Sequence, residues 1–228
     1  MKTLALIFGI LICHASDVVA QTAPSPDEIS NYTGLHAAAA KGDTSKIISL
    51  AKSGSDLNAR DGFGRTALMV ATYQNHMATA KALIAAGADL NALDSERYDM
   101  ITIAVVANTL QMMNLAIGSG GNAKLMTSPY DGTALIAAAH LGHVEVVRSL
   151  IKAGAPLDHI NNLKWTALIE AIVLGDGGKN HQLILQDLIS AGADINLADG
   201  SGDTPLTLAR NRNYAAMIKM LEAAGAKP

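Results

Sequence analysis

The sequence predicts an all-α repeat solenoid of six helix-pair repeats that are joined by β-hairpin-like turns. A Leu or Ile that opens a helix recurs at intervals of 33, 33, 34, 33 and 38 residues, at Leu35, Leu68, Ile101, Leu135, Leu168 and Leu206. A glycine recurs with nearly the same spacing, at Gly54, Gly87, Gly120, Gly154, Gly192 and Gly225. Two short helices cannot bury an apolar face by themselves, so this period indicates units that stack into one continuous core.

Residues 1–20 predict a secretory signal peptide. Lys2 provides a positive start, residues 4–13 form an apolar run, and small residues precede an expected cut after Ala20. An apolar run of ten residues is too short to span a membrane as a helix. An uncleaved anchor and a lipoprotein attached through Cys13 are the alternatives. Cys13 is the one cysteine of the chain, so its removal would suit an oxidising compartment, and we expect a periplasmic or secreted protein.

The remaining chain divides into a short leader and the repeat domain. Residues 21–30 are rich in Pro and Ser and are expected to form a polar leader before the folded part. The repeat domain covers residues 31–228, with repeats at about 31–60, 61–93, 94–127, 128–160, 161–198 and 199–228. In repeat 4, the apolar residues from Leu135 to Ala139 and from Val144 to Ile151 have the spacing of two helical faces. Gly154 suits the left-handed position that ends the second helix.

The start of five repeats resembles the ankyrin signature Thr-Pro-Leu-His. The matching segments are Thr33-Gly34-Leu35-His36, Thr66-Ala67-Leu68, Thr133-Ala134-Leu135, Thr166-Ala167-Leu168 and Thr204-Pro205-Leu206. The chain is thus similar to exported bacterial ankyrin-repeat proteins over residues 31–228. The resemblance implies a module that binds a protein partner on its concave side, which consists of the hairpin tips and the exposed end of each first helix. The proteins of this class include some that neutralise a toxic enzyme or support stress defence.

Two repeats depart from the pattern. In repeat 3, Asp99 stands where Thr is expected and Asn108 replaces a glycine, which leaves the local bonding of its hairpin open. Residues 100–123 of this repeat are uncharged, but their polar residues favour a buried helix pair over a membrane span, and we expect no span in the mature chain. Repeat 5 carries five extra residues between its two helices.

Aromatic residues mark the concave side as the candidate binding surface. Six of the seven aromatic residues that follow residue 20 are expected there, and Tyr214 is the exception. Aromatic side chains are favoured anchors because each buries a large area with few rotatable bonds. The candidate contact residues are Phe63, Arg65, Tyr73, Gln74, Tyr98, Tyr130, His140, Trp165 and Glu170. For Tyr32, Tyr98 and Trp165 the alternative is that each braces one hairpin against the next.

The insertion in repeat 5 is a second candidate for recognition, through Asp176, Lys179 and His181. A flexible loop is the alternative. The segment is not a phosphate-binding P-loop, because Asn180 follows Lys179 where Ser or Thr is required.

Glu170 replaces a commonly apolar residue of a first helix. We expect it to be half-buried and to pair with Lys164 or contact a ligand. A hydrolase that uses Glu170 and His140 is an alternative function, although no nucleophile stands beside them at a recognised spacing. No metal ligands at a recognised spacing and no cofactor motif are apparent, so neither is expected.

The composition bears on the class of partner. The net charge is -3 and only 16% of the residues are charged, so a basic surface for nucleic acid is not expected. We expect a non-enzymatic module that is monomeric when unbound and binds another protein. An architectural subunit of an envelope complex is the alternative.

Overall fold

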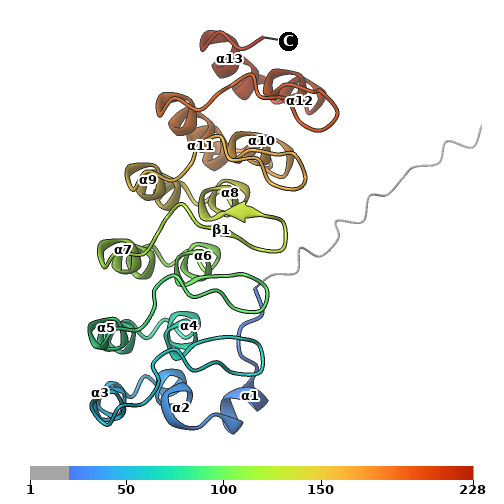
Figure 1. The fold of residues 1–228 in the computed structure, drawn as a ribbon. Coiled ribbons are helices and arrows are strands. Elements are labelled where there is room, and N and C mark those ends of the chain that lie inside the picture. Colours follow the sequence, from blue (N-terminus) through green and yellow to red (C-terminus); the bar gives the residue numbers. More distant parts are fainter. Residues whose placement is uncertain (1–20, 228) are drawn as a thin grey trace, which may run out of the picture.

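The computed structural model describes residues 21–227, which form a single stack of helix pairs (Figure 1). The first helices of the repeats make one column, and the second helices make a parallel column beside it. The loops between repeats project from the side of the first helices. This arrangement confirms the predicted solenoid of six repeats. The expected signal peptide, residues 1–20, lies outside the described residues.

The helix boundaries follow the repeat period. The first helices are α2 (Gly34–Lys41), α4 (Ala67–Tyr73), α6 (Met100–Val106), α8 (Ala134–His140), α10 (Ala167–Val173) and α12 (Pro205–Asn211). The second helices are α3 (Thr44–Lys52), α5 (Met77–Ala86), α7 (Leu110–Gly118), α9 (Val144–Lys152), α11 (Lys179–Ser190) and α13 (Ala215–Ala223). Within residues 21–227, no helix is both long and apolar enough to cross a membrane.

A side-chain cap begins most of the first helices. Thr133 accepts a hydrogen bond from the main-chain nitrogen of Ile136 at 3.3 Å, and Thr66, Thr166 and Thr204 cap their own helices in the same way. In repeat 3, Asp99 takes this role by accepting from the nitrogen of Thr102 at 2.8 Å. Asp and Thr are both strong N-caps, so repeat 3 keeps its helix start without the threonine.

Small side chains allow the first helices to pack closely on one another. Five alanines that stand five residues after each cap are completely buried, namely Ala71, Ala104, Ala138, Ala171 and Ala209. Larger apolar residues such as Leu83, Met112 and Leu150 are also fully buried and fill the layer between the two columns. All of them belong to one continuous cluster, as expected for units that are stable only when stacked.

An Asx residue organises most of the hairpins. Asn161 Oδ1 accepts hydrogen bonds from the main-chain nitrogens of Leu163 and Trp165, both at 3.0 Å. Asp61, Asp94 and Asp199 do the same in their own hairpins. Only one connection among the described residues contains paired strands, β1 (Met126–Thr127) and β2 (Gly132–Thr133). These local bonds make the hairpin tips defined structures that can position contact residues.

The segment before the first repeat differs from the expected leader. Residues Pro26–Asn31 form helix α1, which begins with a capping box at Ser25 and Glu28. Helix α1 packs beside α2 (Figure 1), and Pro24 is buried. The segment is therefore part of the folded domain.

Candidate protein-binding surface

The concave side carries most of the exposed apolar surface. Among residues 21–227, seven large apolar side chains are substantially exposed, and six of them lie on the hairpins or at the ends of first helices: Phe63, Met126, Leu141, Ile160, Leu163 and Leu174. The seventh, Ile48, lies on α3 in the column of second helices. Single exposed apolar residues are common on proteins, but a concentration on one side marks an interaction surface.

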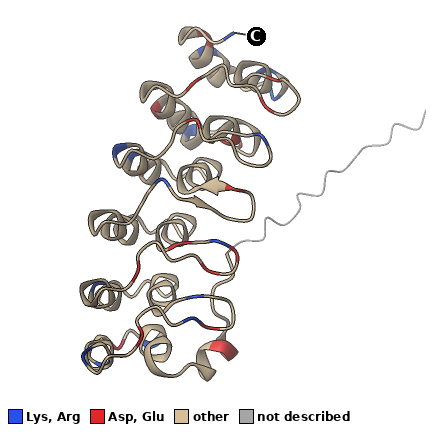
Figure 2. Cartoon of the chain, viewed as in Figure 1, with Lys and Arg blue, Asp and Glu red and all other residues tan. Residues whose placement is uncertain are grey.

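Charged residues are distributed differently on the two parts of this side. In Figure 2, the hairpins before α4 and α6 carry both acidic and basic residues, whereas α6 and α8 show none. Helix α10 contains one acidic residue, Glu170. The first helices α4, α6 and α8 thus contain no Lys, Arg, Asp or Glu, whereas the hairpins carry charged residues along the whole stack.

The prediction that Arg65 is an exposed contact residue at the tip of its hairpin is wrong. Its side chain is only 1% exposed. Its Nε donates to Asp61 at 2.7 Å, and Nη1 donates to the main-chain oxygen of Thr22 at 3.0 Å. Nη2 donates to Glu28 and to the Tyr32 hydroxyl. The guanidinium is thus enclosed by acceptors, three of them on the segment before α2.

The two carboxylates around Arg65 are held in their charged form. Burial raises the pKa of Asp61, but hydrogen bonds from Tyr32 and Arg65 outweigh burial and hold the pKa below its ordinary value. For Glu28, hydrogen bonds from Ser25 and Arg65 likewise outweigh burial and lower the pKa. Phe63, which is 49% exposed, lies with its ring 4.6 Å from the Arg65 guanidinium. Phe63 is therefore an available contact residue with a fixed orientation.

Tyr73 and Tyr98 belong to a small apolar cluster between repeats 2 and 3. They pack with Met69, Ala92 and Ile103, separately from the main core. Tyr98 is buried, and burial raises the pKa of its hydroxyl to about 12. This location agrees with the bracing role, the alternative weighed for Tyr98. Tyr73 is half-buried, as is the adjacent Gln74.

The remaining aromatic candidates are half-buried on the hairpins of repeats 4 and 5. Tyr130 contributes its main-chain oxygen, which accepts from the nitrogen of Asn162 at 3.0 Å and joins the two hairpins. Trp165, on the hairpin of repeat 5, packs against the main core. Both residues therefore combine a structural role with partly exposed ring surface.

Glu170 is more deeply buried than expected, at 5% exposure, and Lys164 is not its partner. Its Oε1 accepts a hydrogen bond from Asn161 Nδ2 at 2.8 Å, and its Oε2 lies 3.5 Å from Nδ1 of His140. The candidates Glu170 and His140 are thus brought together from α10 and the end of α8. Asn161 was not among the predicted site residues, although its place five residues before Thr166 matches the Asx residues of the other hairpins.

The insertion in repeat 5 is a packed structure between two repeats. His181 is buried, with its Nδ1 2.8 Å from Asp176 and its Nε2 3.0 Å from the main-chain oxygen of His140. His143 and His76 make equivalent contacts to the oxygens of Val105 and Ala40. His181 is therefore a structural contact between repeats rather than an exposed recognition residue. Asp176 and Lys179 remain exposed.

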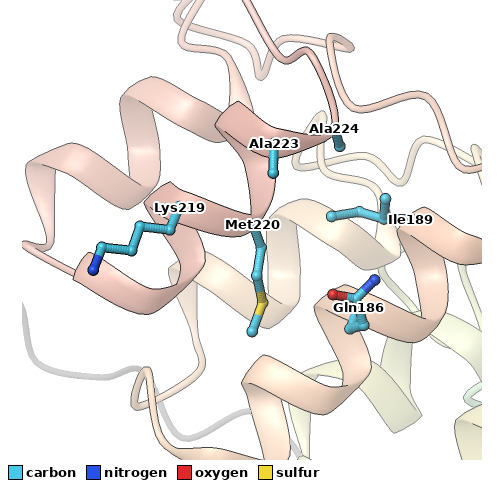
Figure 3. A pocket seen from close by; sticks show the side chains of 6 residues that line it. All are labelled: Gln186, Ile189, Lys219, Met220, Ala223 and Ala224. Carbon is cyan, nitrogen blue, oxygen red and sulfur yellow. The ribbon is translucent and has the colours of Figure 1, made fainter.

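Shallow grooves are present away from this surface, between second helices. One, of about 430 Å³, lies between α11 and α13 and is lined by Gln186, Ile189, Lys219, Met220, Ala223 and Ala224 (Figure 3). A second, of about 390 Å³, lies between α5 and α7. Within residues 21–227, no group of three or more His, Cys, Asp or Glu side chains is arranged to hold a metal ion.

Comparison with known proteins agrees with the repeat architecture. The sequence matches the family of ankyrin repeats (three copies) over residues 7–94, 35–118 and 101–199. It is 35% identical to the ankyrin repeat protein YahD of Escherichia coli, over 83% of this chain and 94% of that protein. An ankyrin repeat domain from Acinetobacter baumannii is 47% identical, with a TM-score of 0.81 over 85% of this chain and 98% of that one.

A second similar structure comes from a complex. It is a chain of the complex between a predatory endopeptidase and an immunity protein from Bdellovibrio bacteriovorus, with 25% identity and a TM-score of 0.71 over 84% of this chain and 98% of that one. Ankyrin repeats are generally non-enzymatic modules for protein interaction. The helix pairs, the capped hairpins and these matches together show that the chain belongs to the ankyrin-repeat family.

Proposed function

We propose that this protein is exported and binds a protein partner through its concave side. The observation that supports this most directly is the location of six of the seven substantially exposed large apolar side chains on that side. Burying such side chains contributes to affinity roughly in proportion to their area, and well-packed anchors dominate the energy of an interface. The capped hairpins hold these residues in place, which reduces the entropy lost on binding.

A matched set of variants tests the surface. The triple variant Phe63→Ala, Leu141→Ala and Leu174→Ala removes exposed apolar side chains from three repeats without touching the fully buried core. Ile48→Ala removes one of similar exposure from α3. Pull-down from the envelope fraction with the purified chain as bait should recover a protein that the triple variant fails to retain and that Ile48→Ala retains. Equal recovery by all three proteins would contradict binding through the concave side.

Export is supported by the charge and hydropathy pattern of residues 1–20. Cleavage after Ala20 would leave Gln21 as the first residue of the mature protein. Fractionation followed by intact mass measurement should find a periplasmic protein that begins at Gln21. A full-length chain that starts at Met1 and remains in the cytosolic fraction would be inconsistent with export.

The proposed role is protective, by holding a partner enzyme in an inactive complex. The similarity to a chain of the endopeptidase–immunity protein complex supports this role. The captured partner, once identified, should be an enzyme whose activity falls on addition of one equivalent of this protein. A partner that is not an enzyme, or whose activity is unchanged in the complex, would exclude the protective role while leaving the binding function in place.

A further inference from the structure

The concave side contains a buried carboxylate, Glu170, that is not paired with a Lys or Arg side chain. Glu170 is 5% exposed, and within residues 21–227 it forms no ion pair with Lys or Arg. Its Oε1 is occupied by the hydrogen bond from Asn161, and its Oε2 has only Nδ1 of His140 at 3.5 Å. This distance exceeds that of an ordinary hydrogen bond, so Oε2 retains capacity to accept one.

The local structure holds this carboxylate in a fixed position. Asn161, which donates to it, is itself fixed because its Oδ1 accepts from the nitrogens of Leu163 and Trp165. The main chain of His140 is held by His181, whose Nε2 lies 3.0 Å from the main-chain oxygen of His140. A buried carboxylate that is already desolvated and oriented gains more from a matching cation than a mobile surface carboxylate does.

The surroundings of Glu170 provide an apolar rim. Leu141 and Leu174 follow directly on the helices that carry His140 and Glu170, and both are exposed. Ile160 and Leu163 flank Asn161 on its hairpin and are also exposed. The surface around Glu170 therefore combines an anionic group with exposed apolar residues, a combination that suits recognition of a charged side chain on an amphipathic partner segment.

Two arginines near the concave side have acceptors within this chain. At the N-terminal part, Arg65 is neutralised by Asp61 and Glu28 of this chain. In the repeat after Glu170, Arg212 donates to the main-chain oxygen of Val173 at 3.1 Å and, within residues 21–227, forms no ion pair with Glu170. Neither arginine compensates Glu170, so its carboxylate remains available for an external cation.

We propose that the concave side accepts an arginine side chain of the partner protein at Glu170, with apolar partner residues packing on Leu141 and Leu174. The proposal rests on the proposed binding function and specifies its partner chemistry. Rotation of the His140 imidazole, whose side chain is 27% exposed, opens Oε2 to the incoming guanidinium. Arginine fits better than lysine because its planar group binds a carboxylate directionally and stacks on exposed apolar or aromatic surface.

A peptide probe tests this assignment without knowledge of the natural partner. The probe is acetyl-Gly-Leu-Arg-Leu-Gly-amide, and its control carries citrulline, a neutral isostere, in place of arginine. Binding is followed by NMR on the full mature chain, through the methyl groups of Leu141 and Leu174 and the side-chain carboxyl of Glu170. The expected result is saturable shifts at all three groups with arginine, and at least tenfold weaker binding with citrulline.

Two protein variants complete the experiment. Glu170→Gln keeps the size of the side chain and an acceptor for Asn161 but removes the charge, so it should weaken binding of the arginine peptide at least tenfold. Glu170→Gln should bind the citrulline peptide about as weakly as the wild type does, because both changes remove the same interaction. Glu145→Gln makes the same chemical change on the exposed face of α9 and should leave affinity unchanged.

Three outcomes would overturn the assignment. If both peptides shift Leu141 and Leu174 with equal affinity, the apolar surface binds but Glu170 does not select a cation, and the proposed concave-side function survives. If neither peptide perturbs these groups, or if Glu170→Gln binds the arginine peptide as the wild type does, the arginine site is rejected. Backbone spectra that match the wild type establish that each variant is folded.

Discussion

The hydroxyl of Tyr32 donates a hydrogen bond to Asp61 across 2.6 Å, and this contact ties the segment before the first repeat to the hairpin of the second. Arg65 lies at the same place and adds Thr22 and Glu28 to the network. The first repeat of a solenoid has no preceding repeat to cover it. In this protein, helix α1 and its ion pairs serve as the N-terminal cap.

Arg65→Ala should destabilise the protein by about 2–4 kcal/mol, because it leaves the largely buried Asp61 carboxylate without its cation. The measurement is urea unfolding monitored by circular dichroism. Arg148→Ala is the control, since Arg148 is exposed and its pairs with Glu145 and Asp187 are expected to contribute little to stability. Equal effects of the two substitutions would show that the Arg65 network is not a buried structural element.

The stabilisation by Arg65 should depend on pH with a defined sign. The pKa values of Glu28 and Asp61 are lowered from ordinary values of 4.5 and 3.8. A carboxyl group whose pKa is lowered in the folded state stabilises that state above its ordinary pKa and loses this effect as the pH falls through the lowered value. The difference in unfolding free energy between wild type and Arg65→Ala should therefore be constant from pH 7 to about 5 and shrink towards pH 3. A difference that grows on acidification would contradict this sign.

Gly177→Ala should destabilise the insertion of repeat 5. Gly177 has a φ of +68°, and an added Cβ would lie 2.5 Å from the ring of Tyr214. We expect a loss of about 1–3 kcal/mol, measured by thermal unfolding, from the strained backbone and the steric conflict. Gly62→Ala is the control because nothing lies within 4 Å of its added Cβ. If Gly177→Ala and Gly62→Ala lower the thermal stability equally little, the insertion is a flexible loop, which is the alternative considered from the sequence.

Asn161→Ala should lower stability by about 2–3 kcal/mol, since it removes the acceptor for two hairpin nitrogens and the donor to the buried Glu170. Asn162→Ala in the same hairpin removes one exposed hydrogen bond, to Pro129, and should cost much less. Urea unfolding of the two variants compares them directly. Similar stabilities would mean that Asn161 does not support the carboxylate.

Periodicity in the sequence was sufficient to predict the helix pairs and their stacking. The repeated Leu and Gly fix where each helix begins and ends, and the Thr residues identify the caps. The partners of Arg65 could not be predicted, because Glu28 lies 37 residues away in a segment that has no repeat pattern. The position of Asn161 beside the helix start was easier to predict from the sequence, since an Asx residue precedes the cap by five residues in repeats 2, 3, 5 and 6.

Burial explains why the predicted contact residues did not all lie on the surface. Register places Arg65, Tyr98 and His181 on the hairpins or turns, but it does not reveal which side chains fold back onto a neighbouring repeat. Arg65 and His181 find hydrogen-bond partners within the chain, and Tyr98 joins an apolar cluster. Exposed apolar residues outside the aromatic class, such as Leu141 and Leu174, proved to be a better guide to the free surface.

Hydrogen–deuterium exchange on the complex with the captured partner tests the central claim most directly. Binding through the concave side should slow exchange in the hairpins of repeats 4 and 5 and at the ends of α8 and α10, while α9 and α11 change little. Protection confined to the second helices, including the grooves beside α5 and α13, would contradict the account.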